Sequence, residues 1–425
     1  MTIPPGYSVL QGKPIPPNLV CKLRKSLYGL KQASRQWNIK ISGVLLASGF
    51  LQSVADTSVF VRRVGSSLVV VLIYVDDILL SGNDSTLIDS TKVTLQSKFE
   101  IKDLGPPQYF LGIEISRSST GIHLCQRKYA LELLEEYGLL GSKPVHTPTD
   151  LKEKLTHDSG ELLYDASFYR QLIGKLIYLS VTRPYICFAV QKLSQFMSSP
   201  RSLHLQAAFR VLKYLKSAPS QGLLYSASSS LTLKAYSDAD WASCPNTRRS
   251  ITGYCVFLGN SMVSWKSKKQ STVSRSITES EYRALAQTGC ELIWIDSLLK
   301  DLHISCQRPF NIYCDNQSTL HLARNLVLYE RTKHIRLDCH FIRQHISSGL
   351  LQPLHVRSND QVADLLTKPL VSDQFKFLLS KWSLYKAFLR YTKSIFFPKA
   401  LCVPLALNVF FKFWKSVLRL QVAAG

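Results

Sequence analysis

The apolar residues of this chain change their spacing between residues 221 and 230, and this change limits the folds that the chain can adopt. Over residues 169–215 they recur at helical intervals, whereas Leu231, Leu233 and Ala235 alternate as in a strand. The ten residues between the two patterns carry no charge and many serines, and we interpret them as a linker. The pattern therefore predicts two separately folded parts, not one continuous core.

The part after residue 230 has the element order of an α/β domain. Its apolar pattern predicts strands and helices in the order Tyr254–Leu258, Val263–Trp265, a long helix over Thr278–Leu302, a strand over Phe310–Cys314, and helices over Ile335–Ile346 and Ser358–Leu366. Strands followed by a helix, and then by another strand and helix, are typical of an α/β domain with its own core.

The part before the linker contains the strongest strand signal of the chain. Residues 69–75 are apolar and mostly β-branched, and residues 78–80 resume the pattern, which predicts a hairpin with Asp76 and Asp77 at its turn. A mostly helical pattern precedes it over Leu27–Phe50, and prolines and glycines between Gly141 and Pro148 indicate a domain boundary.

The charge and the apolar runs narrow the choice of partners. Lysine and arginine total 52 against 29 aspartates and glutamates, so the formal net charge is +23. Such a surplus indicates a polyanionic partner, and nucleic acid is the first candidate. The longest uncharged apolar runs, 64–75 and 400–411, have twelve residues each, whereas a bilayer span needs about 20. The start lacks a basic and apolar leader, and the ten cysteines include no C-x-x-C pair, so we expect an intracellular protein with reduced thiols and no membrane partner.

The adjacent Asp76 and Asp77 have two interpretations. A hairpin turn often uses aspartate to bond its own backbone, which would be a purely structural role. Two adjacent carboxylates between apolar strands also repel each other unless a cation separates them, which favours metal binding. The residues alone leave both interpretations open.

A second group of acids is spread along the α/β part, each at the end or the beginning of a predicted element. The group consists of Asp238 and Asp240 after the first strand, Glu279 and Glu281 at the start of the long helix, Asp315 after a later strand, and Asp364 in the last short helix. Helix capping would explain several of them singly, including Glu279, Glu281 and Asp315. Together they predict a carboxylate cage at one sheet edge, suited to two hard cations.

Several short strings make a resemblance specific. They are Ser26–Trp37, Tyr74–Asp77 and Tyr109–Ile115 in the first part, and Tyr236–Trp241, Ser264–Gln270, Glu279–Leu285, Tyr313–Ser318, Arg331–Ile335 and Ala363–Pro369 in the second. In this order they resemble the reverse transcriptase and ribonuclease H of copia-type retrotransposon Pol polyproteins. The implied fold is an α+β polymerase palm/thumb remnant followed by an α/β ribonuclease H-like domain with a mixed sheet.

The resemblance also implies a division of the chain and a set of metal ligands. The division is a truncated reverse transcriptase (1–148), a helical connection (149–230), a ribonuclease H-like domain (231–370) and a basic tail of unknown structure (371–425). The implied ligands are Asp76 and Asp77 in the polymerase, and the catalytic Asp238, Glu281, Asp315 and Asp364 with two Mg²⁺ or Mn²⁺ ions in the nuclease. The choices of Asp238 over Asp240 and of Glu281 over Glu279 rest on the resemblance, because periodicity does not make them.

Nucleic-acid contacts are expected in both parts. The resemblance places Lys31 and Gln32 against nucleotide and template, and the basic string with Lys266, Lys268 and Lys269 would follow phosphates, together with Arg248, Arg249 and Arg275. A solvated basic surface is the alternative for this string. The expected partners are an RNA–DNA hybrid, a template–primer duplex and other products of a retroelement polyprotein, in a cytoplasmic virus-like particle or in the nucleus.

One part of the family pattern is missing. The polymerase of the family has a third aspartate on an upstream strand. The only acidic residue among residues 1–75 is Asp56, which does not match the position of that strand. We therefore expect an incomplete polymerase joined to a nuclease that hydrolyses the RNA of RNA–DNA hybrids with divalent cations. The alternative is a non-catalytic, nucleic-acid-binding remnant of a degenerate retroelement.

Overall fold

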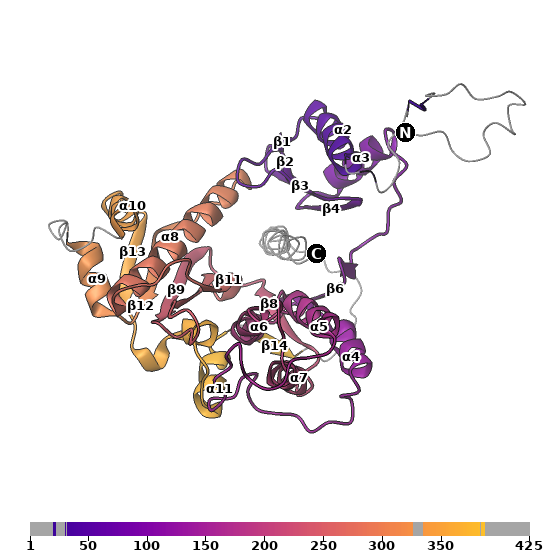
Figure 1. Ribbon diagram of the computed structural model, residues 1–425. Coiled ribbons are helices and arrows are strands. Elements are labelled where there is room, and N and C mark those ends of the chain that lie inside the picture. Colours follow the sequence, from indigo (N-terminus) through magenta and orange to yellow (C-terminus); the bar gives the residue numbers. More distant parts are fainter. Residues whose placement is uncertain (1–19, 23–29, 31, 326–334, 383, 387–425) are drawn as a thin grey trace, which may run out of the picture. The chain divides into compact units, whose positions relative to one another are not determined.

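The computed structural model describes residues 20–22, 30, 32–325, 335–382 and 384–386 (Figure 1). Lys31, most of the string Arg331–Ile335 and residues 387–425 lie outside this part. The described chain forms two compact units, one drawn from residues 1–80 and 84–102 and the other from residues 81–83 and 103–425.

The first unit packs two helices against a four-stranded sheet whose strands follow sequence order. Its elements are α2 (Ala33–Ala47), β1 (Leu51–Gln52), β2 (Val59–Val64), β3 (Ser67–Tyr74), β4 (Asp77–Gly82) and α3 (Ser85–Gln96). Ile41 of α2, Phe60 of β2 and Val71 of β3 are among its buried core residues. The predicted hairpin is confirmed, because β3 and β4 are neighbours joined by Val75 and Asp76.

The second unit contains two sheets, of which the first is antiparallel with the order β14-β8-β7-β6-β5. Its strands are β5 (Tyr109–Phe110), β6 (Ile113–Ser118), β7 (Gly121–Cys125), β8 (Gln221–Ser226) and β14 (Leu384–Lys386). The helices between β7 and β8 are α4 (Arg127–Glu136), α5 (Ala166–Leu179), α6 (Cys187–Ser194) and α7 (Ser202–Leu215), with the short η1 (Pro184–Ile186) before α6.

Strand β8 corrects the interpretation of residues 221–226 as part of a linker, whereas residues 227–230 do connect β8 to the next strand. Strand β8 pairs with β7, and Gly222, Leu223 and Tyr225 are buried there. The segment lacks charges because its strand is buried, and not because it is flexible. The β7–β8 pair also joins residues on both sides of the predicted boundary at 148, so the structure divides the chain near residue 102 instead.

The second sheet is mixed, as expected, with the order β11-β10-β9-β12-β13. Strands β9, β10 and β11 are antiparallel neighbours, whereas β12 runs parallel to both β9 and β13. The elements are β9 (Thr232–Asp240), β10 (Ile251–Leu258), β11 (Ser261–Lys269), α8 (Ile277–Asp301), β12 (Gln307–Cys314), α9 (Gln317–Arg324), α10 (Arg336–Ser347), β13 (Leu351–His355), η3 (Ser358–Asp360), η4 (Val362–Leu366) and α11 (Ser372–Ser380).

Two elements fall within the stretch that we expected to be a tail without a definable fold. Helix α11 buries Phe375 and Leu378, and β14 pairs with β8. Part of the predicted tail is therefore folded into the second unit. Within the described residues, no helix combines the length and the apolarity needed to cross a bilayer.

Candidate metal centre

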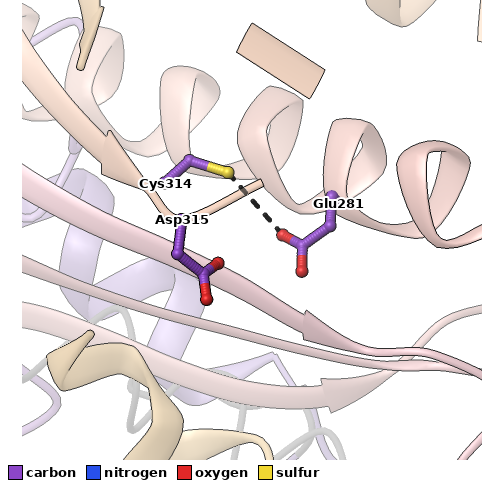
Figure 2. Close-up of side chains that lie close together, drawn as sticks. All are labelled: Glu281, Cys314 and Asp315. Carbon is purple, nitrogen blue, oxygen red and sulfur yellow. Dashed lines mark hydrogen bonds between the residues drawn. The ribbon is translucent and has the colours of Figure 1, made fainter. Parts of the chain in front are cut away.

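The four acids predicted as metal ligands come from four elements of the second unit. Asp238 lies near the end of β9, Glu281 in the first turns of α8, Asp315 directly after β12, and Asp364 in η4. The ligand atoms of Glu281, Cys314 and Asp315 lie within 4.8 Å of one another. In Figure 2 the Glu281 carboxylate reaches from α8 toward the end of β12, where Cys314 and Asp315 stand.

Asp238 and Asp364 are connected through a lysine and a threonine that follow η4. The Lys368 Nζ lies 3.5 Å from Asp238 Oδ2 and 2.9 Å from Asp364 Oδ1. The hydroxyl of Thr367 donates a hydrogen bond to Asp238 Oδ2. Asp238 of β9 and Asp364 of η4 therefore share the ammonium group of Lys368 and lie in one cluster.

Short helix η4 is held against the sheet by a hydrogen bond from Gln361, and Gly253 leaves the space for it to approach. Gln361 Nε2 donates to the backbone oxygen of Ser237, the neighbour of Asp238, at 2.9 Å. Gly253 of β10 pairs with Asp238, and a Cβ at residue 253 would lie 2.5 Å from Thr367 Cγ2. Any larger residue there would push η4 away, so this glycine permits the approach of Asp364 to Asp238.

The beginning of α8 separates the roles of its two glutamates. Ser276 accepts a hydrogen bond from the Glu279 amide at 3.1 Å, and Glu279 bonds the Arg275 amide at 2.8 Å and Arg283 Nη2 at 2.9 Å. Glu279 is thus used in the helix cap. Glu281 points to the cluster, and Gln270 holds this turn in place by donating to the Ser280 backbone oxygen at 3.0 Å.

Asp315 is not the cap of the helix that follows it. Asn316 caps α9, because its Oδ1 accepts a hydrogen bond from the Thr319 amide at 2.9 Å. The helix-cap alternative for Asp315 is therefore wrong, and its role as a metal ligand stays a prediction.

Burial and mutual repulsion raise the pKa of three of the acids. Asp238 is 2% exposed, and its burial raises its pKa, with a further contribution from Asp315. Burial, Asp238 and Asp315 together raise the pKa of Glu281 well above its usual value. Burial and Asp238 raise the pKa of Asp364 to about 7. The cluster thus holds more negative charge than its surroundings stabilise.

The chemistry of these groups fits a hard divalent cation. Carboxylate oxygens are the ligands that Mg²⁺ and Mn²⁺ prefer, and a cation would relieve the repulsion among them. Cys314 does not suit such a ligand set, because Mg²⁺ and Mn²⁺ prefer oxygen ligands to sulfur. Its Sγ donates instead to Glu281 Oε2 at 3.8 Å.

Asp240 lies at the edge of this arrangement. It ends β9 and is only partly buried. Burial raises its pKa, the charge of Lys368 opposes this shift, and the charge of Asp238 adds to it. Its chain neighbour Asp238 is the one that bonds Thr367 and pairs with Lys368. β9 places both aspartates on one face, so the choice of Asp238 as the ligand stays a prediction, which its contacts with Thr367 and Lys368 favour.

Two residues of the cluster, Thr367 and Lys368, were not predicted as site residues. Reasoning from carboxylates alone could not find them. A signal was present, because Lys368 follows Asp364 by four residues, and residues at this spacing face each other on a helical turn.

Comparisons with known proteins place the chain in a family. The sequence model of the reverse transcriptase (RNA-dependent DNA polymerase) family matches residues 1–151. A retrovirus-related Pol polyprotein from transposon RE1 of Arabidopsis thaliana is 48% identical over 381 residues, which cover 90% of this chain and 26% of that protein. A putative transposon Ty5-1 protein of Saccharomyces cerevisiae is 32% identical, with 68% of this chain and 94% of that protein covered. The chain belongs to the copia-type retrotransposon Pol polyprotein family.

The chain spans about a quarter of the length of the RE1 Pol polyprotein. A solved structure of the foamy viral protease-reverse transcriptase in complex with an RNA/DNA hybrid is similar over 81% of this chain and 40% of that one, at 13% identity. Its TM-score of 0.42 is too low to establish a shared fold.

The matched reverse transcriptase region of this Pol family member includes Asp76 and Asp77. Both are exposed at the β3–β4 turn, where Val75 has a φ of 46°. Among the described residues, no third acidic, histidine or cysteine side chain completes a ligand group with them. Asp56 is used locally, because its Oδ1 accepts hydrogen bonds from the amide and the hydroxyl of Ser58 at 2.9 and 2.7 Å.

The basic residues predicted to contact nucleic acid fall on different faces. Lys266 and Lys268 share one face of β11, whereas Lys269 lies on the opposite face and donates to Gln195 Oε1 at 2.7 Å. Lys269 is therefore occupied within the protein. Gln32 precedes α2 without capping it through its side chain, and Lys31 lies outside the described residues.

Proposed function

We propose that the second unit is a ribonuclease H-like nuclease that hydrolyses the RNA strand of an RNA–DNA hybrid with the help of Mg²⁺ or Mn²⁺. The observation that carries this proposal is the convergence of four acids from four elements, with raised pKa values for Asp238, Glu281 and Asp364. Lys368 supplies one positive charge to this cluster, and burying the remaining like charges together is costly. The arrangement therefore points to a bound divalent cation.

The proposed ligands are Asp238, Glu281, Asp315 and Asp364. When bound here, a pair of divalent cations would lower the pKa of a water and stabilise the oxygen that leaves in phosphodiester hydrolysis. The protein's own task is to hold the carboxylates in place. Gln361, Gly253 and Gln270 do this for η4 and α8, and Thr367 orients the Asp238 carboxylate.

The nucleic acid would be bound chiefly through its phosphates. Lys266 and Lys268 on β11 are proposed as phosphate contacts, and the exposed Arg248 and Arg275 lie on loops of the same domain. Such contacts supply affinity without reading the base sequence. Discrimination of the RNA strand would then depend on contacts to its 2′-hydroxyl groups.

For the first unit we propose no independent polymerase activity in this chain. Two metal ions need more than two carboxylates to be held in register for nucleotidyl transfer. Asp76 and Asp77 lack a third acidic partner among the described residues. Membership of a Pol family supports nucleic acid as the ligand of this unit as well, in the form of a template–primer duplex.

The direct test is cleavage of labelled substrates by the 425-residue chain in MgCl₂, in MnCl₂ and in EDTA. We expect cleavage of the RNA strand of a hybrid with either metal, none in EDTA, and none of duplex DNA of the same sequence. Asp238→Asn is expected to remove the activity, whereas Asp240→Asn is the matched control on the same strand. Cleavage that persists in EDTA or in Asp238→Asn would contradict the proposal, and binding without cleavage would favour a non-catalytic remnant.

A further inference from the structure

The ammonium group of Lys368 occupies the space between two of the four acids. It lies 2.9 Å from Asp364 Oδ1 and 3.5 Å from Asp238 Oδ2. The side chains of these two aspartates are 10% and 2% exposed. Among the described residues, Lys368 is the only basic group that forms an ion pair with either of them. One positive charge is therefore shared by two buried carboxylates.

The backbone fixes where this ammonium group can reach. The amide of Lys368 donates to the Asp364 backbone oxygen at 3.2 Å, so the lysine begins one turn above the aspartate. The same helical turn is bound to β9 by the hydrogen bond of Gln361, and it packs closely on β10 at Gly253. The lysine is thus tethered beside the carboxylates and is not a mobile surface residue that happens to approach them.

The lysine side chain is only partly enclosed by the cluster. It is 33% exposed, so solvent reaches part of it. Thr367 bonds the same Asp238 oxygen independently, so the Asp238 carboxylate keeps an anchor when the lysine moves.

We propose that Lys368 is a built-in counter-cation, which joins Asp238 to Asp364 in the metal-free protein and is displaced to solvent when a divalent cation binds them. The inference rests on the proposed function, because it takes the same carboxylates as metal ligands. Cation loading is then an exchange, and part of the binding free energy is lost in breaking the lysine's ion pairs. Lys368 is a positioning residue of the metal-free cluster.

Three consequences separate this role from simple packing. Lys368→Met keeps the length of the side chain but removes the competitor, so Mn²⁺ should bind tighter by roughly fivefold or more, as for a coupling of ordinary size. The same variant should melt at a lower temperature in EDTA, because the two acids lose their shared charge. In the wild type, Mn²⁺ should make the Lys368 amine more reactive toward reductive methylation.

The chain offers a matched control in Lys300. Its Nζ pairs with Asp296 Oδ2 at 2.7 Å, again four residues apart and with a buried carboxylate, but away from the metal centre. Asp296 keeps Arg308 as a second partner at 2.9 Å. Lys300→Met should leave Mn²⁺ affinity unchanged, and Mn²⁺ should not alter the labelling of Lys300.

The experiment is a Mn²⁺ titration of the full chain without nucleic acid, followed by the electron paramagnetic resonance signal of free Mn²⁺, with pulse labelling and peptide mass spectrometry in parallel. Tighter binding by Lys368→Met, together with metal-induced labelling of Lys368 in the wild type, supports the exchange. Labelling that Mn²⁺ leaves unchanged overturns it even if the variant fails to fold, since this measurement uses the wild type. A wild type that binds no Mn²⁺ contradicts the proposed function as well.

Discussion

The two acidic groups of this chain are built in opposite ways. Asp76 and Asp77 are neighbours in sequence and stand exposed at the end of a hairpin. Asp238, Glu281 and Asp364 are far apart in sequence and are buried. They lie close together because β9, α8 and η4 meet at one place. The first group is local, and the second is a product of the fold.

The difference shows what makes carboxylates a metal centre. Exposed acids remain hydrated, so a hairpin can carry two of them without a compensating group. Buried acids lose that hydration, and the raised pKa values of Glu281 and Asp364 record the cost. Lys368 places one positive charge beside two of the buried acids, Asp238 and Asp364.

The largest effect is expected at the two glutamates of α8. Glu281→Gln should reduce hybrid cleavage by more than the roughly 10–100-fold that is typical of losing a residue that only orients a ligand. Glu279→Gln should change cleavage little and lower the melting temperature instead, because Glu279 serves the helix cap and pairs with Arg283. Initial rates in MgCl₂ and melting curves of both variants decide between them. Equal losses of activity in the two variants would contradict the assignment of Glu279 to the helix cap and of Glu281 to the metal centre.

The buried acids should also make metal-free stability depend on pH. The folded pKa of Asp364 is raised to about 7 from an ordinary 3.8, so between these values the folded state binds more protons than the unfolded chain. Stability should therefore fall as pH rises through this window, by up to about 1.4 kcal/mol per pH unit for one such group. Urea unfolding in EDTA from pH 5 to pH 8 measures the free energy of unfolding. Its decrease with pH should be smaller with Mg²⁺ or in Asp364→Asn. Stability that rises with pH in EDTA would contradict the assignment.

Some of this could be anticipated from the residues and some could not. Acids at element ends predicted the convergence, because the ends of neighbouring strands share one sheet edge. The uncharged segment that forms β8 resembles a linker in its sequence, since a lack of charge occurs in both flexible and buried chain. Asn316 supplies the helix cap that was the structural alternative for Asp315, a choice that depends on the local backbone alone. Lys368 stayed hidden because its role appears only where the acids meet.

A moderate effect is expected from the basic residues of β11. If the chain neutralises about six phosphates, the log–log salt slope of duplex binding should be roughly −5. Lys266→Ala and Lys268→Ala should each flatten the slope by about one unit, for any base sequence. Lys269→Ala should flatten it less, because its ammonium group already bonds Gln195. Alternation along the strand could have predicted this division. Binding measured by fluorescence anisotropy at several salt concentrations tests it, and a slope near zero would remove β11 from the interface.

The smallest effect is expected at the hairpin. Asp76→Asn should leave hybrid cleavage and melting temperature unchanged, since this exposed carboxylate belongs to the other unit. We also expect no primer extension by the wild-type chain alone with Mg²⁺ or Mn²⁺. Template-dependent incorporation that is lost in Asp76→Asn would show that the exposed pair forms a working centre after all.

The central claim is that the acids of the second unit act on a substrate through bound metal and do not merely support the fold. Asp315→Asn and Asn316→Ala test it most directly, because the two residues are adjacent and only Asn316 caps α9. Hybrid cleavage in MgCl₂ should collapse in Asp315→Asn, while its melting temperature in EDTA holds or rises. Asn316→Ala should lose about 1 kcal/mol of stability and keep its cleavage. Cleavage that survives Asp315→Asn would contradict the account.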